Sequence, residues 1–345
     1  MATQKGQITI PALVDLHVHF REPGYAYKET IVTGSAAALA AGYEHVFTMP
    51  NVKPAPDTVE HLKAQLSLIQ PQNPLHVHPY ASITLCQTGE GNLVNMEELA
   101  PYVAGFSDDG VGVATEELMR EAMIRCAAVD RVIVEHCEVR GIPASDPRSE
   151  YEEIARNVKL AEETGCRLHI CHISTKQSVE IIRRAKARGV LVTCETCPHY
   201  LLLNDRMVKD SGDYKMNPPI RTLEDQMALI AGIQDGTIDC ISTDHAPHSA
   251  EEKSRGFAGS LNGIVGIETA FPLCYTYLVR PGIISLERLI ELMSIKPREI
   301  MRIAEPARRV TFDVETEYEI DPSQFLSKGK STPFKGWKVV GRLVA

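Results

Sequence analysis

The sequence predicts an α/β protein that folds as a (β/α)8 TIM barrel with a small β appendage. Eight short apolar runs alternate with amphipathic stretches along most of the 345 residues. This alternation is typical of parallel strands joined by helices, and eight such units close into a barrel. After about Arg308 the pattern changes to period-two alternation of apolar and polar residues, which indicates β-strands.

The expected strands are short and mostly apolar. In chain order they are Ala12–Leu16, His45–Met49, Leu75–Leu85, Val103–Phe106, Arg131–Glu135, Arg167–Cys171, Val190–Thr193 and Ile238–Ser242. Helical spacing of apolar residues predicts the connections, and the interval before the fourth strand holds only a short helical stretch. These helices are Lys28–Ala41, Thr58–Ile69, Thr115–Ala128, Glu150–Glu163, Lys176–Arg188 and Leu223–Gln234.

Both ends of the chain contribute to the expected appendage. We expect residues 11–305 to form the barrel, and residues 1–10 and 306–345 to form the small β unit. The N-terminal stretch QITIPA can pair with the C-terminal stretches RVTFDVETEYEID and GWKVVGRLVA. The connection into this unit looks short, so we expect a reduced appendage that affects stability or assembly rather than chemistry.

Charge and composition narrow the function classes. The net charge is -9 and the basic residues are scattered, which argues against nucleic acid or an acidic membrane as a partner. There is no apolar region of signal-peptide length, and no apolar run approaches the roughly 20 residues of a membrane span, so we expect a cytoplasmic protein. Nine scattered cysteines do not indicate a disulfide framework, and Cys194-Glu195-Thr196-Cys197 is interpreted as buried thiols on a strand.

Histidine or aspartate follows five of the eight expected strands, where barrels of this class place their chemistry. A single such residue has an ordinary explanation as a hydrogen-bonded histidine or a helix-capping aspartate. Five at matching positions indicate a site for zinc or a similar divalent ion. The residues are His17 and His19, Asp108-Asp109, His136, His172, and Asp244.

Two His-x-His pairs compete for the role of metal ligands. Residues i and i+2 of a strand point to the same side, so His17 and His19 can hold one ion. His76 and His78 have the same spacing but lie early in a longer run, below the rim, and we interpret them as structural. We give His169 the same structural interpretation because it lies in mid-strand.

Six motifs together resemble the dihydroorotase family of the amidohydrolase superfamily. The resemblance runs from about Ile10 to the C-terminus. It implies a reversible reaction of pyrimidine (UMP) biosynthesis, in which N-carbamoyl-L-aspartate closes to dihydroorotate and water. The motifs are DLHVHFREPG, MPN (49–51), FSDDG (106–110), HICHIST (169–175), YKMNPP (214–219) and STDHAPHSAEEK (242–253).

The resemblance also implies a metal centre with one or two zinc ions, of which two are favoured. His17, His19 and Asp244 would hold one ion, and His136 and His172 would hold the other. Metal-bound water with its pKa lowered to about 7 would supply hydroxide at neutral pH. Asp244 would take up the water proton as general base and return it to the leaving nitrogen as general acid.

Many members of the superfamily bridge the two metals with a carboxylated lysine from the fourth strand. The segment Glu98–Val113 contains no lysine. Its FSDDG motif resembles the branch in which an aspartate is the bridge, and motif matching favours Asp109 over Asp108.

The substrate contacts are likewise implied by the resemblance. The arginine two residues beyond the His-x-His pair suits a substrate carboxylate, which a guanidinium can bind through two hydrogen bonds. An asparagine would bind the ring amide, and a loop would touch the substrate through its backbone. The implied contacts are His19, Arg21, Asn51, Asn217, His248, Asn262 and Gly263.

Two alternatives stay open. Allantoinase and hydantoinase share the metal frame but bind different substrates. A catalytically inactive homologue could serve as a scaffold for aspartate transcarbamoylase, although the expected ligands are all present. The sequence leaves the oligomeric state open, including a homodimer and an association with aspartate transcarbamoylase.

Overall fold

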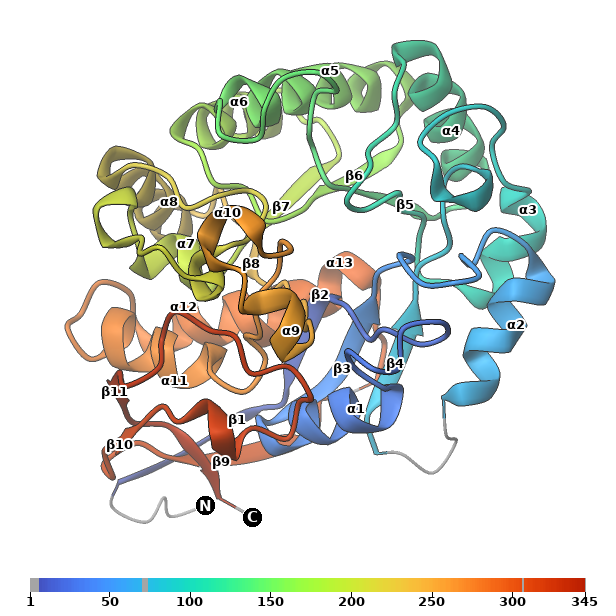
Figure 1. Cartoon of the computed structure of the whole chain (residues 1–345). Helices are drawn as coiled ribbons and strands as arrows, with labels where there is room; N and C mark the ends of the chain where they lie inside the picture. Colours follow the sequence, from blue (N-terminus) through green and yellow to red (C-terminus); the bar gives the residue numbers. More distant parts are fainter. Residues whose placement is uncertain (1–5, 70–73, 306, 345) are drawn as a thin grey trace.

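Parallel strands enclose a barrel and helices surround it in the computed structural model, which describes residues 6–69, 74–305 and 307–344 (Figure 1). The strands pair in register as two sheets, β2-β3-β4 and β5-β6-β7-β8. This confirms the predicted barrel. The strands are β2 (Leu13–Val18), β3 (Tyr43–Thr48), β4 (His76–Pro79), β5 (Val132–Glu135), β6 (Arg167–Ile170), β7 (Val192–Thr196) and β8 (Cys240–Ile241).

The fourth position of the barrel differs from the prediction. Val103–Phe106 was expected as a strand, but the structure has only isolated bridges at Phe106, to Ala81 on one side and Ile133 on the other. The segment still joins the two sheets, because Phe106 N donates to Val132 O at 3.0 Å. Gly105 permits this close approach, since a Cβ there would lie 2.5 Å from Val132 O.

The expected strand Leu75–Leu85 is also wrong in length, because β4 ends at Pro79. The carboxylate of Asp108 accepts hydrogen bonds from the backbone N–H groups of Ile83 (2.8 Å) and Thr84 (3.2 Å). These bonds take the place of ladder bonds and turn the chain away from the sheet. The barrel closes where Val18 bridges to His245 beyond β8.

The six predicted helices are all present. Threonine caps five of them, because the Oγ1 atoms of Thr30, Thr58, Thr115, Thr175 and Thr222 each accept a backbone N–H of the first turn. No helix in the described ranges is long and apolar enough to cross a membrane. The helices are α1 (Ile31–Ala40), α2 (Val59–Leu68), α3 (Met96–Leu99), α4 (Glu116–Ala128), α5 (Arg148–Thr164), α6 (Lys176–Ala187), α7 (Pro198–Leu202), α8 (Leu223–Asp235), α9 (Ala250–Lys253), α10 (Gly256–Gly259), α11 (Ala270–Cys274), α12 (Leu286–Ile290) and α13 (Lys296–Met301).

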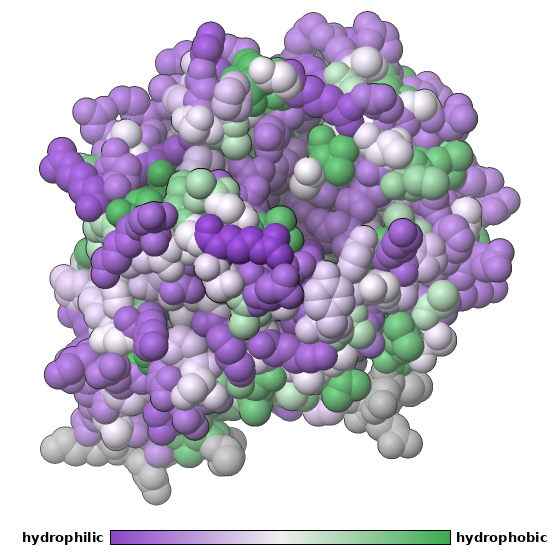
Figure 2. All heavy atoms as spheres, in the orientation of Figure 1, coloured by the Kyte–Doolittle hydropathy of each residue, from purple (hydrophilic) through white to green (hydrophobic). Residues whose placement is uncertain are grey.

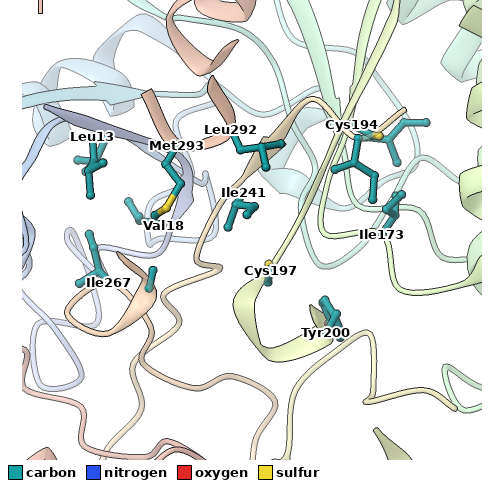
Figure 3. Close-up of a cluster of buried hydrophobic side chains, with 14 of the residues drawn as sticks. Leu13, Val18, Ile173, Cys194, Cys197, Tyr200, Ile241, Ile267, Leu292 and Met293 are labelled. Atoms are coloured by element: carbon teal, nitrogen blue, oxygen red, sulfur yellow. The ribbon is translucent and has the colours of Figure 1, made fainter. Parts of the chain in front are cut away.

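Two apolar clusters hold the barrel together. The larger one lies between the strands and the helices, and Figure 3 draws part of it, with Leu13 of β2, Ile241 of β8 and Met293 close together. The smaller one joins Val14 of β2 with Phe47 of β3 and other strand side chains. Side chains from strands around a barrel meet only across its interior, so that interior is a packed core.

The predicted β appendage is confirmed. Strand β1 (Gln7–Pro11) pairs antiparallel with β9 (Arg309–Asp313), which also pairs with β12 (Arg342–Val344). A second pair joins β10 (Tyr318–Glu319) to β11 (Lys338–Val339). Phe312 of β9 stacks on Phe271 of α11, with ring centroids 3.9 Å apart, and this contact fixes the sheet to the barrel. Figure 1 shows β9 and β10 beside the two ends of the chain. Residues 1–5, 306 and 345 of the expected appendage lie outside the described residues.

Candidate active site

A cavity of about 200 Å³ opens at the end of the barrel where the strands finish. Figure 2 shows a hollow in this face with mostly hydrophilic side chains around it. The site residues predicted from the sequence come together here, and all but His17 line the cavity. The lining residues are His19, Arg21, Asn51, Asp109, Gly110, His136, His172, Asn217, Asp244, Ala246, His248, Asn262 and Gly263.

One group of possible metal ligands forms around the end of β2. His17 and His19 present their Nε2 atoms 3.3 Å apart, as the i, i+2 spacing predicts. Asp244, beyond β8, places Oδ1 3.0 Å from His19 Nε2 and 3.4 Å from His17 Nε2. Three buried atoms of the kinds that bind zinc therefore face a common point.

A second group lies beside the first. His136 Nδ1 and His172 Nε2 are 3.0 Å apart. Asp109 Oδ1 lies between the groups, 3.4 Å from His17 Nε2 and 3.8 Å from each of the other two ring nitrogens. Asp108 points away and binds the backbone before the 3-10 turn at 85–87, so only Asp109 faces the histidines.

Both carboxylates of the site are ionised in the geometry described here. Burial alone would raise the pKa of Asp109, but the neighbouring rings, His17 foremost, hold it well below its usual range. The pKa of Asp244 is lowered in the same way, by its hydrogen bond with His19 and by the nearby imidazoles. A buried pair of carboxylates among imidazoles favours a bound cation.

The backbone at two of these residues is in an unusual conformation. His172 has φ +32° and Asp244 has φ +46°, in the region where non-glycine residues are rare. Such conformations persist where the surrounding structure imposes them, and they concentrate at functional sites. Both residues lie just beyond strand ends, so the backbone turns sharply where the ligand side chains must enter the cavity.

The part of the cavity wall formed by Arg21 and His248 is suited to an anion. Arg21 is buried, and its Nε donates to the backbone oxygen of Pro247 at 3.2 Å. It forms no ion pair with a carboxylate in the part of the chain that the structure describes. His248 lies on the same wall and is fixed through its Nε2, 2.7 Å from Asn262 O. A buried guanidinium without an anionic partner is costly, so an anion bound at this wall would offset that cost.

Sequence comparisons identify relatives that match nearly the whole chain. A family model described as Dihydro-orotase-like matches residues 6–152. A dihydroorotase of Anoxybacillus flavithermus is 47% identical over 366 aligned residues, covering 97% of this chain and 84% of the relative. The chain belongs to the dihydroorotase family. Family members from Bacillus caldolyticus (45% identical, 97% and 84% covered) and Staphylococcus epidermidis (46%, 98% and 85%) match equally broadly.

Solved structures similar to this dihydroorotase-family chain include an L-hydantoinase (dihydropyrimidinase) from Arthrobacter aurescens. Its TM-score is 0.86 at 26% identity, covering 98% of this chain and 83% of the other. A dihydropyrimidinase from Brevibacillus agri NCHU1002 has a TM-score of 0.87 at 21% identity, covering 98% and 83%, which is a likeness of fold alone. The barrel is therefore shared with hydantoinases, one of the two alternatives above. The dihydroorotases are more similar to this chain in sequence, and this similarity is what separates the two families.

Three residues at the site of this family member were missed by the sequence reasoning. Glu195 Oε1 lies 2.9 Å from His17 Nδ1, and Glu138 Oε2 lies 3.0 Å from His136 Nε2. Glu138 could have been found, because it follows His136 by two residues. Glu195 stood in a motif that we interpreted only through its cysteines, which are indeed buried free thiols.

Lys253 is the third residue that was missed. Its Nζ is buried and donates to three backbone oxygens, at Lys215 (3.1 Å), Leu261 (2.8 Å) and Gly263 (2.7 Å). It thereby joins the loop of Asn217 to the loop of Gly263, both of which line the cavity. The signal was its place at the end of the STDHAPHSAEEK motif of the family.

The competing His-x-His pair does not line the candidate active site, in agreement with the prediction that it lies below the rim. Strand register places His76 beside His45 and His78 beside Phe47. His45 Nδ1 is 3.0 Å from His78 Nε2, and the rings stack. This pair lines a separate cavity that shares no lining residue with the candidate active site.

Proposed function

We propose that this chain catalyses the dihydroorotase reaction, closing N-carbamoyl-L-aspartate to (S)-dihydroorotate and water and running the reverse. Family membership at 45–47% identity supports this activity in pyrimidine biosynthesis. The observation that carries it is a single cavity that holds imidazole and carboxylate groups together with the buried Arg21, which has no carboxylate ion-pair partner among the described residues. That combination suits a cyclic amide that bears a carboxylate.

The residues present fit a metal ion. Asp109 Oδ1 is buried and has no hydrogen-bond partner among the described residues, yet ring nitrogens surround it at 3.4 to 3.8 Å. Imidazole and carboxylate donors suit zinc. We propose two zinc ions, one on His17, His19 and Asp244 and one on His136 and His172, with Asp109 as the bridge. When bound, such ions polarise the substrate carbonyl and lower the pKa of water.

Asp244 is the proposed general base and acid. It is ionised, lines the cavity and is oriented by His19 at 3.0 Å. In the hydrolytic direction it takes a proton from the attacking water while the C–O bond forms, and gives it to the ring nitrogen as the C–N bond breaks. Cyclisation follows the same proton path in reverse.

Substrate orientation is assigned to the other residues that line the cavity. Arg21 and His248 would hold the carboxylate, Asn217 the ring amide, and Asn262 with Gly263 the rest of the ring through the backbone. Asn51 has a double role in this proposal. It lines the cavity, and it also orients two proposed metal ligands. Its Oδ1 lies 2.7 Å from His19 Nδ1, and its Nδ2 donates to Asp109 Oδ2 at 2.9 Å.

Hydantoinase activity is the second candidate, because the fold likeness to the A. aurescens enzyme favours it. Turnover of dihydroorotate, dihydrouracil, hydantoin and allantoin by the purified chain distinguishes the two. We expect turnover of dihydroorotate far above that of the three substrates without a carboxylate. Turnover confined to those three would overturn the proposal, and no turnover of any would favour a scaffold role.

Location and assembly complete the proposal. Nine unpaired cysteines are usual in a reducing compartment, which supports a cytoplasmic location. Association of two copies, or with aspartate transcarbamoylase, stays a prediction that light scattering of the chain alone and mixed with that enzyme can test.

A further inference from the structure

We propose that Glu195 is a positioning residue that keeps His17 in the tautomer able to bind a metal ion. The inference rests on the metal site of the proposed function and deepens it. Glu195 lies in β7 and is fully buried. It does not line the cavity, and the mechanism above does not use it.

The contact between Glu195 and His17 defines which ring nitrogen carries the proton. Glu195 Oε1 is 2.9 Å from His17 Nδ1, and a carboxylate can only accept, so Nδ1 is the donor. In the neutral ring Nε2 then has a free lone pair. This Nε2 is the atom that faces His19 Nε2 at 3.3 Å and Asp109 Oδ1 and Asp244 Oδ1, each at 3.4 Å.

The carboxylate is itself fixed from its other oxygen. Glu195 Oε2 accepts a hydrogen bond from Ser242 Oγ and lies 3.2 Å from His169 Nε2. His169 is held in turn, with Nδ1 2.8 Å from Thr193 Oγ1. Three strands of the barrel, β2, β6 and β7, and the segment after β8 thus contribute to one buried chain of contacts. His169, which we interpreted as structural, orients Glu195 within it.

The same arrangement recurs at other proposed ligands. His19 Nδ1 lies 2.7 Å from Asn51 Oδ1, and His136 Nε2 lies 3.0 Å from Glu138 Oε2. Metal-binding histidines commonly donate their second N–H to such an oxygen, which fixes the ring and the tautomer. Glu195 differs from Glu138 in burial, because the side chain of Glu195 is 0% exposed whereas that of Glu138 is 32% exposed. Water therefore cannot take the place of the Glu195 carboxylate as hydrogen-bond acceptor.

The test replaces Glu195 by glutamine, which keeps the shape. The new amide N–H₂ can donate to His17 Nδ1 and so favours the proton on Nε2, where it blocks the metal. We expect Glu195→Gln to bind Zn²⁺ about 10- to 100-fold more weakly than the wild type. The measurement is competition of the full-length chain with a chromogenic chelator, at a pH where circular dichroism shows both proteins folded.

Asp239→Asn is the matched control. Asp239 Oδ2 accepts the backbone N–H of Cys194, the neighbour of Glu195, at 2.8 Å and the Nζ of Lys186 at 2.6 Å. The substitution Asp239→Asn therefore removes a negative charge that supports the same strand, and it leaves the contact between Glu195 and His17 in place. We expect its zinc affinity to equal that of the wild type.

Each outcome has a distinct meaning. Wild-type affinity in Glu195→Gln, or an equal loss in Asp239→Asn, contradicts the positioning role. A wild-type chain that binds no Zn²⁺ refutes the proposed metal site instead. Should Glu195→Gln not fold, Ser242→Ala removes one donor to Glu195, and the same competition assay is applied to it. An unchanged Zn²⁺ affinity in Ser242→Ala contradicts the inference.

Discussion

At the residue scale, Arg21 is the side chain on which substrate choice depends. It is buried beside the cavity, and the described part of the chain supplies no carboxylate partner. Removing one partner of a buried charged pair costs about 2 kcal/mol or more, a factor of roughly 30 in binding. Arg21→Met should therefore raise KM for dihydroorotate by a factor of roughly 30 or more, with a smaller change in kcat.

Steady-state kinetics of the Arg21 variant provide the measurement. The exposed Arg255, changed to Met, is the control and should leave KM unaltered. A KM within twofold of wild type in Arg21→Met would place the substrate carboxylate elsewhere.

The sequence was sufficient for residues whose position in a strand defines their role. His17, His136 and Asp244 each follow an apolar run, and the barrel brings the ends of those runs together. Glu195 was beyond that reasoning, because its partner is 178 residues away and depends on which side of β7 the carboxylate takes.

At the element scale, two loops of the cavity depend on Lys253. Its three hydrogen bonds join loops that carry Asn217 and Gly263. In Lys253→Met three backbone oxygens, of which that of Gly263 is buried, lose their donor, which should cost about 2 to 3 kcal/mol of stability. Because the loops separate, KM for dihydroorotate should rise as well.

Thermal unfolding and steady-state kinetics of the same preparation measure both effects. Lys335→Met, at an exposed lysine, is the control for loss of a charge. A variant that loses stability but keeps the wild-type KM would show that Lys253 supports only the fold.

Element boundaries were predictable where local chemistry decides them. Threonine at Thr58, Thr115 and Thr222 marks helix starts that the sequence pattern also finds. The conformation of Val103–Phe106 and the end of β4 could not be predicted in this way. The backbone there depends on Asp108, which is 25 residues from Ile83 in sequence, and on the close approach of Gly105 to Val132.

At the scale of the whole molecule, the His45–His78 pair links stability to pH. Burial, with nearby charges such as Arg298 and His76, lowers the pKa of His45 to about 3. Burial and His76 lower that of His78 to about 4, with Glu305 acting in the opposite direction. In the unfolded chain both histidines titrate near 6.5.

The contribution of this histidine pair to stability should therefore fall as the pH drops from about 6.5 towards 4, because the unfolded chain protonates the two histidines first. Each proton changes the free energy of unfolding by up to about 1.4 kcal/mol per pH unit. His78→Gln should reduce this slope, measured by denaturant unfolding at several pH values, and His76→Gln should reduce it less, because the exposed His76 acts on the pair only through its charge. Equal slopes in all three proteins would contradict the assignment.

The appendage affects the stability of the whole molecule through Phe312. This ring is buried and stacks on Phe271 of the barrel at 3.9 Å. Phe312→Ala should cost about 3 to 5 kcal/mol of stability and leave kcat for dihydroorotate unchanged. Calorimetry with an activity assay below the transition tests this. A large fall in kcat of the folded variant would mean that the appendage takes part in the chemistry.

The central claim is a metal-dependent dihydroorotase reaction in the cavity lined by His19, Asp109, His136, His172 and Asp244, with His17 directly behind them. The most direct measurement is dihydroorotate turnover by the purified chain before chelation, after removal of metal, and after titration with Zn²⁺. The account predicts that turnover disappears on chelation and returns with one to two equivalents of zinc per chain. Full turnover by the metal-stripped chain, or none at any zinc level, would contradict it.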